Sequence, residues 1–345
     1  MALLDGLRVL DLTMWRPGPY ATQLLAQLGA DVIKVEPPGG EPMRMFGGHF
    51  ELLNQYKRSI VLNLKDQRDR ARCLELARDA DVFVEGYRPG VADRLGVGYD
   101  AAGRGNARLV YCSLSGYGAY GDLADVPGHD VNYRAYTGAL PPDAVSPEAD
   151  ELPVADMGAA TMAAFAITAA VLKARETGQG DRIDLGMADV LANWVGTVPA
   201  ATVRNAGTGP LPGYGVYPAK DGLITIGVVS EQHLWAATCR ALGLPEHADV
   251  PFLDRLGRVR ELDAEIAAAV APLTREEAVR RLTEAGAPVA PALTRDEMME
   301  LPHFRQRGVI AEGTVGSPVR TMIHPPLPPG PIAGLDAHHG EGWSG

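Results

Sequence analysis

The alternation of short apolar runs with amphipathic stretches most constrains how this chain can fold. Residues 7–12, "LRVLDL", form an apolar run, a helix-like stretch follows, and residues 31–36, "DVIKVE", form a second run. Further apolar runs lie at residues 58–64, 81–87 and 107–116. Strands that alternate with helices predict an α/β fold with a mostly parallel sheet covered on both faces. Ligands of such sheets bind at the carboxyl ends of the strands.

The turn after the first predicted strand carries no nucleotide-binding signature. It reads "TMWRPGPY", without the G-x-G-x-x-G of dinucleotide-binding proteins, and the chain contains no Walker sequence. The layout is therefore Rossmann-like without the usual dinucleotide-binding turn, and we expect no nicotinamide cofactor.

The character of the sequence changes near residue 195. Residues 155–180 predict one long helix that starts at or just after Asp156. Beyond it, "GVYPAKDGLITIGVV" predicts two strands joined by a turn, and the helices that follow are amphipathic and rich in Ala, Glu and Arg. We therefore expect a large domain over residues 1–195 and a smaller α+β domain over residues 196–300.

Composition excludes several classes of partner. The 345-residue chain has a formal net charge of −11, whereas nucleic acids and anionic membranes attract proteins rich in Lys and Arg. Three widely spaced cysteines, none in a C-x-x-C pair, indicate buried thiols in a reducing compartment. The longest apolar run, residues 162–172, is too short to span a bilayer, and we find no signal peptide. We expect a cytoplasmic protein without nucleic-acid or membrane partners.

Three residues are candidates for catalysis, and each also has a structural interpretation. His129, in "PGHDVNYRAYTGAL", is either a capping or core histidine or a proton-transfer base. Asp156, at the apparent helix start, is either an N-cap or a reactive carboxylate, with the amides of Met157 or Gly158 as oxyanion donors. Glu231 follows "TIGVVS" and is either a first-turn acid or a site residue.

Basic residues group near the ends of the predicted strands. Lys57 and Arg58 lie in "QYKRSI", Arg88 in "GYRPG" and Arg94 in "VADRLG". Each alone is typical of a surface charge, but together they could bind the phosphates of a nucleotide-like ligand. The adjacent histidines near the C-terminus lack acidic or thiol partners at ligand spacing, so we expect no metal site.

The order of several motifs resembles the family III CoA transferases, a superfamily that also contains α-methylacyl-CoA racemase. The resemblance covers roughly residues 4–240. It rests on "GLRVLDL", "PGP", "QLLAQLGADVIKVEPP", "KRSIVLNLK", "YRPGVADRLG", "LVYCSLSGYG", "GHD", "PVADMG" and "TGQGDRIDLGM". It implies a Rossmann-like large domain built from both ends of the chain, so that residues 301–345 return to it. It also implies an interlocked homodimer.

The resemblance also implies roles for the candidate residues. Asp156 matches the aspartate with which the transferases attack a thioester, through a mixed anhydride and an aspartyl-CoA. The racemases pair that aspartate with the histidine of "GHD", here His129, and with a small-domain glutamate, here Glu231. Because all three positions are occupied, our main prediction is a racemase or epimerase of 2-methylacyl-CoA thioesters, acting by 1,1-proton transfer through an enolate. Coenzyme A would then be part of the substrate, with no permanently bound cofactor.

Two alternatives remain open, and two departures from the family pattern bear on them. The first alternative is a CoA transferase that acts through Asp156, and the second is a CoA-binding protein without catalysis. Many relatives carry an arginine after "KVE", where this chain has Pro37, so Arg16 or Arg44 could replace it in binding CoA. The segment "ADMGAATM" resembles the transferases more than the "GDFGGGG" of the racemases.

Overall fold

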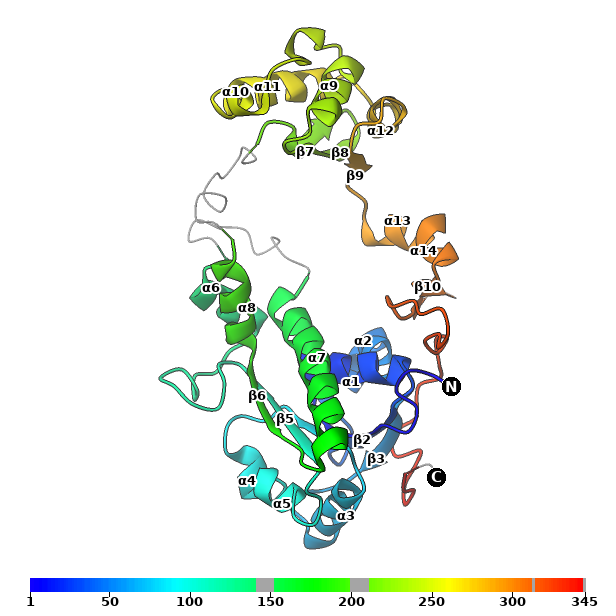
Figure 1. The fold of residues 1–345 in the computed structure, drawn as a ribbon. Coiled ribbons are helices and arrows are strands. Elements are labelled where there is room, and N and C mark those ends of the chain that lie inside the picture. Colours follow the sequence, from blue (N-terminus) through cyan, green and yellow to red (C-terminus); the bar gives the residue numbers. More distant parts are fainter. Residues whose placement is uncertain (141–151, 199–210, 312–313, 344–345) are drawn as a thin grey trace. The chain divides into compact units, whose positions relative to one another are not determined.

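The chain folds into two compact units (Figure 1). The first combines Met1–Thr197 with Pro302–Gly345, and the second is Val198–Leu301. The computed structural model describes residues 1–140, 152–198, 211–311 and 314–343. Each unit has its own hydrophobic core, so the two are described separately.

A six-stranded sheet forms the centre of the large unit. Its strands are β1 (Arg8–Leu12), β2 (Asp31–Glu36), β3 (Arg58–Val61), β4 (Val82–Glu85), β5 (Val110–Ser115) and β6 (Arg182–Gly186). Their order is β3-β2-β1-β4-β5-β6, and all neighbouring strands are parallel. This order is that of doubly wound nucleotide-binding sheets, and it confirms the predicted α/β class and Rossmann-like layout.

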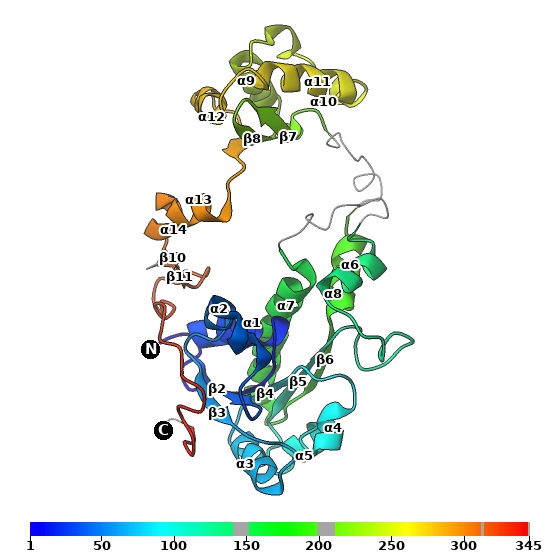
Figure 2. The ribbon, with the colours of Figure 1, turned by 180° about the vertical axis from the view of Figure 1, so that it is seen from behind.

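Helices cover both faces of this sheet (Figures 1 and 2). They are α1 (Pro17–Gln27), α2 (Gly48–Leu53), α3 (Gln67–Arg78), α4 (Val91–Leu95), α5 (Tyr99–Ala102), α6 (Asp130–Thr137), α7 (Val154–Thr177) and α8 (Met187–Gly196), with a 3-10 helix η1 (Pro42–Phe46). Successive strand residues point to opposite faces, so Val9 and Val84 pack with α1 and α7 while Leu10 and Phe83 pack with α3. The strands are apolar on both faces for this reason.

Helix α7 begins earlier than the sequence predicted. Its first residue is Val154 and its N-cap is Pro153, so Asp156 lies inside the first turn and is not the N-cap. Its 24 residues are long and apolar enough, by length and composition, to cross a membrane, whereas the sequence analysis considered only the apolar run within it. A core helix of a soluble protein passes the same test, and Ala159, Ala163 and Ile167 of α7 are fully buried in the core of the large unit.

The small unit is an antiparallel sheet with helices. Strands β7 (Tyr214–Ala219), β8 (Gly222–Gly227) and β9 (Val289–Pro291) pair in that order. The helices are α9 (Gln232–Ala241), η2 (Pro245–His247), α10 (Phe252–Leu256), α11 (Val259–Val270), α12 (Arg275–Glu284) and α13 (Arg295–Glu300). Fully buried Trp235 and Ile224 lie in its core.

The C-terminal segment belongs to the large unit. It contains α14 (Pro302–Gln306), β10 (Ile310–Ala311) and β11 (Thr314–Val315). Beyond them, the carboxylate of Asp336 accepts a hydrogen bond of 2.7 Å from the amide of Val61 in β3. The indole of Trp343 donates one of 3.0 Å to the carbonyl of Leu76 in α3. The Pro- and Gly-rich tail therefore contacts the edge of the sheet.

Candidate functional site

A cavity of about 610 Å³ opens at the carboxyl ends of β1, β4 and β5. Thr13 follows β1, Gly86 follows β4 and Ser115 ends β5, and all three line the cavity. The chain leaves β1 and β4, which are neighbours, toward opposite faces of the sheet, through α1 and through α4. Such a switch point opens a crevice between the two connections, which is where ligands of open α/β sheets bind.

Asp156 lines this cavity from the first turn of α7. The start of α7 is fixed by Asp130, the first residue of α6, whose Oδ1 accepts hydrogen bonds from the amides of Ala155 (2.7 Å) and Asp156 (3.2 Å). The Asp130 side chain thus accepts hydrogen bonds from the free amides at the positive end of the helix dipole. The Asp156 carboxylate makes none of these capping bonds and faces the cavity.

The electrostatic surroundings make Asp156 an unusual carboxyl group. Burial raises its pKa to about 6, repulsion from Asp130 acts in the same direction, and attraction to Arg16 opposes both. A carboxyl group with this pKa is mostly ionised at neutral pH and is more basic than an exposed aspartate. Titratable groups tuned in this way, in a cavity, are typical of nucleophiles and of proton-transfer groups.

His129 also lines the cavity, next to Asp130 in sequence. It is the N-cap residue of α6, and its amide donates a hydrogen bond of 3.0 Å to the Oδ1 of Asn132. Its side chain is exposed. The capping position and the place at the cavity are compatible, so a role in proton transfer stays a prediction.

Glu231 belongs to the small unit. It is the N-cap residue of α9, and its Oε2 accepts a hydrogen bond of 3.1 Å from the amide of Val229. Hydrogen bonds from its own amide and from that of Val229 lower its pKa below the ordinary value. It is fully exposed, and its predicted partnership with His129 stays a prediction.

The amides predicted as oxyanion donors are used by the helix or enclosed in it. The Met157 amide donates to the carbonyl of Pro153 at 3.0 Å. Gly158, one residue further into α7, is packed so closely that a Cβ atom there would lie 2.6 Å from the Trp194 ring. Because α7 starts before Asp156, the free amides lie earlier in the chain than expected, and the Met157 amide is not free for this role.

The four basic residues predicted to bind phosphates do not gather at one place. Arg88 is exposed and lines the cavity, and Arg94 on α4 is exposed but is not among the lining residues that the structure describes. Arg58 pairs with Asp31 at 2.7 Å at the edge of the sheet. Lys57 is enclosed in the protein. Of these four residues, only Arg88 is placed to meet a ligand of this cavity.

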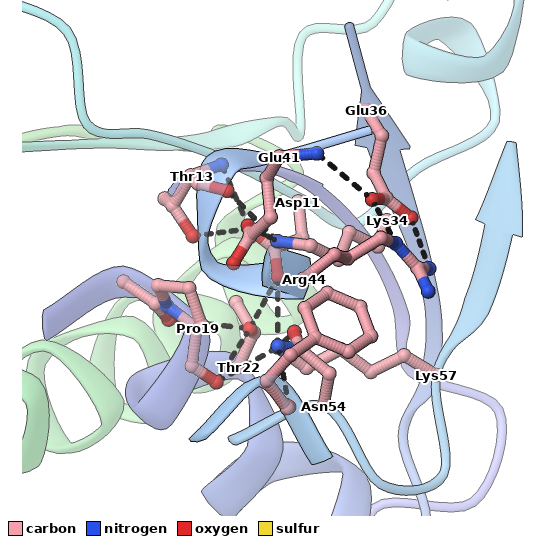
Figure 3. A network of polar contacts seen from close by, with 12 residues as sticks. Asp11, Thr13, Pro19, Thr22, Lys34, Glu36, Glu41, Arg44, Asn54 and Lys57 are labelled. Carbon is pink, nitrogen blue, oxygen red and sulfur yellow. Dashed lines mark hydrogen bonds and ion pairs between the residues drawn. The ribbon is translucent and has the colours of Figure 1, made fainter. Parts of the chain in front are cut away.

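Lys57 belongs instead to a buried polar network beneath the loop that follows β1 (Figure 3). Its ammonium group donates to the carboxylate of Asp11 (3.1 Å), to the carbonyl of Pro19 (2.8 Å) and to the side chain of Asn54 (2.9 Å). Only 2% of its side chain is exposed. The spacing of "QYKRSI" gave no sign of this burial, because Asp11 lies 46 residues away.

The same network includes a second buried lysine. Lys34 contacts Glu41 at 2.6 Å and donates a hydrogen bond of 2.9 Å to the carbonyl of Thr13. Arg44, considered as a CoA contact, pairs with Glu36 at 2.6 Å and is therefore engaged within the protein. Parallel pairing of β1 with β2 aligns Asp11 with Lys34, which brings the opposite charges to one face of the sheet.

Arg16 lies near Asp156 although it is 140 residues earlier in the chain. It is half-buried at the N-cap position of α1, and its Nη1 lies 3.7 Å from the sulfur of Met157. It attracts the Asp156 carboxylate. The sequence analysis placed Arg16 in the loop after the first strand but assigned it to CoA.

A second cavity, of about 170 Å³, lies beside the first at the ends of β1, β2 and β3. Both cavities share Met14 and Tyr87. The smaller one is lined mainly by apolar side chains, together with Pro37, Pro38 and Lys65. An elongated ligand with an apolar or aromatic end could occupy both.

Sequence reasoning missed three polar residues near Asp156. Asp130 caps α7, the buried Tyr133 donates a hydrogen bond of 2.6 Å to the carbonyl of Gly128, and Ser115 lines the cavity with its hydroxyl enclosed. The motif "GHD" contains Asp130, so its third letter was an available signal. Nothing in the local sequence marks Ser115.

A possible metal-binding group lies away from this cavity, in the small unit. Among the residues that the structure describes, the ligand atoms of Glu246, His247 and Glu265 lie within 4.8 Å of one another. The sequence analysis expected no metal site and did not consider these residues. His247 Nε2 and the Glu265 carboxylate already contact each other at 2.5 Å, so these two residues satisfy each other by a short hydrogen bond.

Comparison with known proteins agrees with the motifs. The family model described as CoA-transferase family III matches residues 4–328. Acetyl-CoA:oxalate CoA-transferase of Acetobacter aceti is 36% identical, over 92% of this chain and 88% of its own. Succinyl-CoA:mesaconate CoA-transferase of Haloarcula marismortui is 32% identical, over 99% of this chain and 96% of its own.

Solved structures agree with the fold. The crystal structure of Rv3272 from M. tuberculosis has a TM-score of 0.85 and 29% identity, over 99% of both chains. A CAIB/BAIF family protein from Brucella suis has a TM-score of 0.84 and 26% identity. These similarities cover the large and small units together.

Proposed function

Because the chain belongs to the family III CoA-transferases, we propose that it moves coenzyme A from an acyl-CoA thioester to a free carboxylic acid, with Asp156 as the nucleophile. The observation that carries the proposal is the Asp156 carboxylate, which faces a 610 Å³ cavity and has a pKa raised to about 6. A carboxylate that accepts and returns an acyl group must be ionised, accessible and more reactive than a surface aspartate.

The proposed reaction has two matched halves. A carboxylate oxygen of Asp156 attacks the thioester carbonyl carbon, the C–S bond breaks, and CoA leaves as a thiolate from a mixed anhydride. The thiolate attacks the Asp156 carbonyl carbon of the anhydride, so the donor acid leaves and an aspartyl-CoA thioester remains. The acceptor carboxylate then attacks this thioester, and the same two steps run in reverse. Protons and electrons balance without a further reactant.

The two cavities support a site for CoA. The smaller cavity is mostly apolar and could take the adenine, with Lys65 at its lining, while the chain to the thiol passes Met14 and Tyr87 toward Asp156. Exposed Arg88, in the larger cavity, is the cation best placed for a negatively charged part of the ligand. This arrangement replaces the prediction that Lys57 and Arg58 bind phosphates.

The named relatives favour the transferase over the racemase predicted from sequence. They are called acetyl-CoA:oxalate, succinyl-CoA:mesaconate and succinyl-CoA:glutarate CoA-transferases, and none of these names describes a racemase. Their acceptor acids carry two carboxyl groups each. We therefore propose short dicarboxylic acids as the first acceptors to test.

The test follows CoA and the protein together. We would incubate the protein with acetyl-CoA or succinyl-CoA and with oxalate, mesaconate or glutarate, and identify the acyl-CoA products by liquid chromatography and mass spectrometry. Intact-protein mass spectrometry should show a gain equal to CoA less water, located on the peptide that contains Asp156. Asp156→Asn should abolish both the transfer and the adduct.

His129 provides the control that separates the two activities. His129→Ala should retain CoA transfer, because the transferase steps need no second proton-transfer group. Incubation of a single enantiomer of a 2-methylacyl-CoA in heavy water should then show no inversion with α-deuterium uptake. Inversion that is lost in His129→Ala, without any CoA transfer by the native protein, would contradict the proposal.

A further inference from the structure

Arg16 is a cation without an acidic hydrogen-bond partner among the residues that the structure describes. Its Nη1 lies 3.7 Å from the Met157 sulfur, and a thioether is only a weak acceptor. By contrast, Arg58 and Arg44 in the same unit pair closely with Asp31 and Glu36. Arg16 is not itself a lining residue of the larger cavity, but its neighbours Trp15 and Pro17 are, so the half-buried Arg16 lies at the margin of that cavity.

The loop that carries Arg16 is held from below by the buried network. Asp11 accepts hydrogen bonds from the amide and the hydroxyl of Thr13, and Lys34 donates to the Thr13 carbonyl. Trp15 adopts a φ of +64°, which costs energy for a residue with a side chain. Gly18 packs so closely that a Cβ there would lie 2.2 Å from Thr13. Arg16 thus projects from a backbone that is fixed before any ligand binds.

The charge of Asp156 changes during the proposed reaction, whereas that of Arg16 does not. In the resting protein Arg16 attracts the Asp156 carboxylate. Once Asp156 is an aspartyl-CoA thioester it is neutral, and Arg16 loses that attraction. The acceptor acid must enter at this stage, next to the negative charge of Asp130, which caps α7 at the same helix turn. A planar guanidinium with several donors is well suited to bind an incoming carboxylate.

We propose that Arg16 binds the carboxylate of the acid that receives CoA while Asp156 is held as a thioester. This inference rests on the proposed function and changes the assignment of Arg16 from the CoA nucleotide to the acceptor. The loop after β1 would then bind the acceptor acid, whereas Arg88 would bind a negatively charged part of the acyl-CoA. The Asp11 and Lys34 side chains act as positioning residues for this loop.

The decisive variant is Arg16→Gln, which keeps the length and the polarity of the side chain but removes its charge. The KM for the acceptor acid should rise about tenfold or more, as expected for a lost charge-assisted hydrogen bond, while the KM for the acyl-CoA donor changes less than about twofold. Arg16→Lys should recover part of the loss. Arg175→Gln, at an exposed position in the last turn of α7, serves as the matched control.

A neutral nucleophile isolates the role of charge. Aspartyl-CoA formed with the donor is treated with hydroxylamine, which attacks the thioester without needing a cation. Its rate of cleavage should be the same in Arg16→Gln and the native protein, whereas cleavage by the acceptor acid should slow at least tenfold at equal concentration. Arg88→Gln should instead raise the KM for acyl-CoA and leave the KM for the acceptor acid nearly unchanged.

Four outcomes would overturn this assignment. Equal increases in both KM values would return Arg16 to CoA binding, and equal slowing with hydroxylamine would mean that it only positions Asp156. Unchanged kinetics would show that the acid binds elsewhere. A native protein that forms no aspartyl-CoA with any donor and acceptor would refute the proposed function itself, and with it the inference.

Discussion

Ion pairs are buried beneath the cavity of the large unit but exposed on a helix of the small unit. Beneath the cavity of the large unit, Lys57 and Asp11 are almost wholly enclosed, with 2% and 0% of their side chains exposed. On α12 of the small unit, Arg280 pairs with Glu277 and Glu284 at 2.9 and 2.8 Å, yet about half of its side chain is exposed. The distances are similar, so the surroundings decide what each pair contributes.

Burial makes the inner network sensitive to the loss of any one member. Burial alone would raise the pKa of Asp11, but Lys57, Lys34 and the hydroxyls of Thr13 and Thr22 lower it below the ordinary value. The stability that this provides is present above the pKa of an unfolded aspartate and is lost as the pH falls below it. A buried ion whose partner is removed has neither water nor an opposite charge to stabilise it.

The largest effect on stability is expected for Lys57→Met. The substitution leaves Asp11 buried and without its closest cation, so the free energy of unfolding should fall by about 3–5 kcal/mol. Urea denaturation at pH 7, followed by circular dichroism, measures the change. Lys173→Met, at the exposed pair of Lys173 with Glu176 on α7, should cost about 1 kcal/mol or less. Similar losses in the two variants would break the distinction between buried and exposed pairs.

Much of the fold of the large unit could be predicted from the sequence, because each strand and helix is specified by a short run of neighbouring residues. The apolar runs at β1 and β2 set the strands, and the alternating helices set the parallel sheet. The ordered motifs gave the family, and the family model confirms it. The start of α7 was predicted two residues too late, because "PVAD" contains no side chain that caps the helix locally. The cap comes from Asp130 instead.

The functional assignments depended on contacts distant in sequence, and there the predictions diverged from the structure. Lys57 looked like a loop cation, but Asp11 and Asn54 enclose it. The prediction that Arg16 binds CoA stays a prediction, and the packing of α1 against α7 places this residue by Met157. No periodicity or motif encodes such pairs, so only the folded chain shows which charges remain available to a ligand.

Asp156 is a third case, a half-buried carboxylate at the cavity whose surroundings disfavour its charge. Because its folded pKa is raised to about 6, ionised Asp156 destabilises the protein, and this cost appears as the pH rises from about 4 through 6. The free energy of unfolding of Asp156→Asn should therefore exceed that of the native protein by about 1–3 kcal/mol at pH 8, with no such gain at pH 4. Thermal unfolding of both proteins across this pH range measures the difference. A gain that is equal at both pH values would point to packing instead of charge.

Activity should depend on the same ionisation of Asp156, but in the opposite direction. The ionised carboxylate that lowers the stability of the protein is the form that is needed for the reaction. If Asp156 is the nucleophile, the rate of aspartyl-CoA formation should decline as the pH falls below about 6, where the carboxylate is protonated. Single-turnover measurements between pH 5 and 8 would show this, with Arg175→Gln as the control for surface charge. A rate that does not change with pH would mean that the ionisation of Asp156 affects the stability of the protein but not the rate of aspartyl-CoA formation.

The smallest effect is expected for Arg280→Gln on α12. Both of its ion pairs are exposed, so water and salt already screen them, and the free energy of unfolding should hardly change. The residual effect should vanish in 1 M salt, where the screening length is about 3 Å. The loss in Lys57→Met should persist at that salt concentration, because the solvent ions do not reach Asp11. A salt-sensitive loss there would mean that the inner network is open to solvent, and the fixed loop that presents Arg16 would need another support.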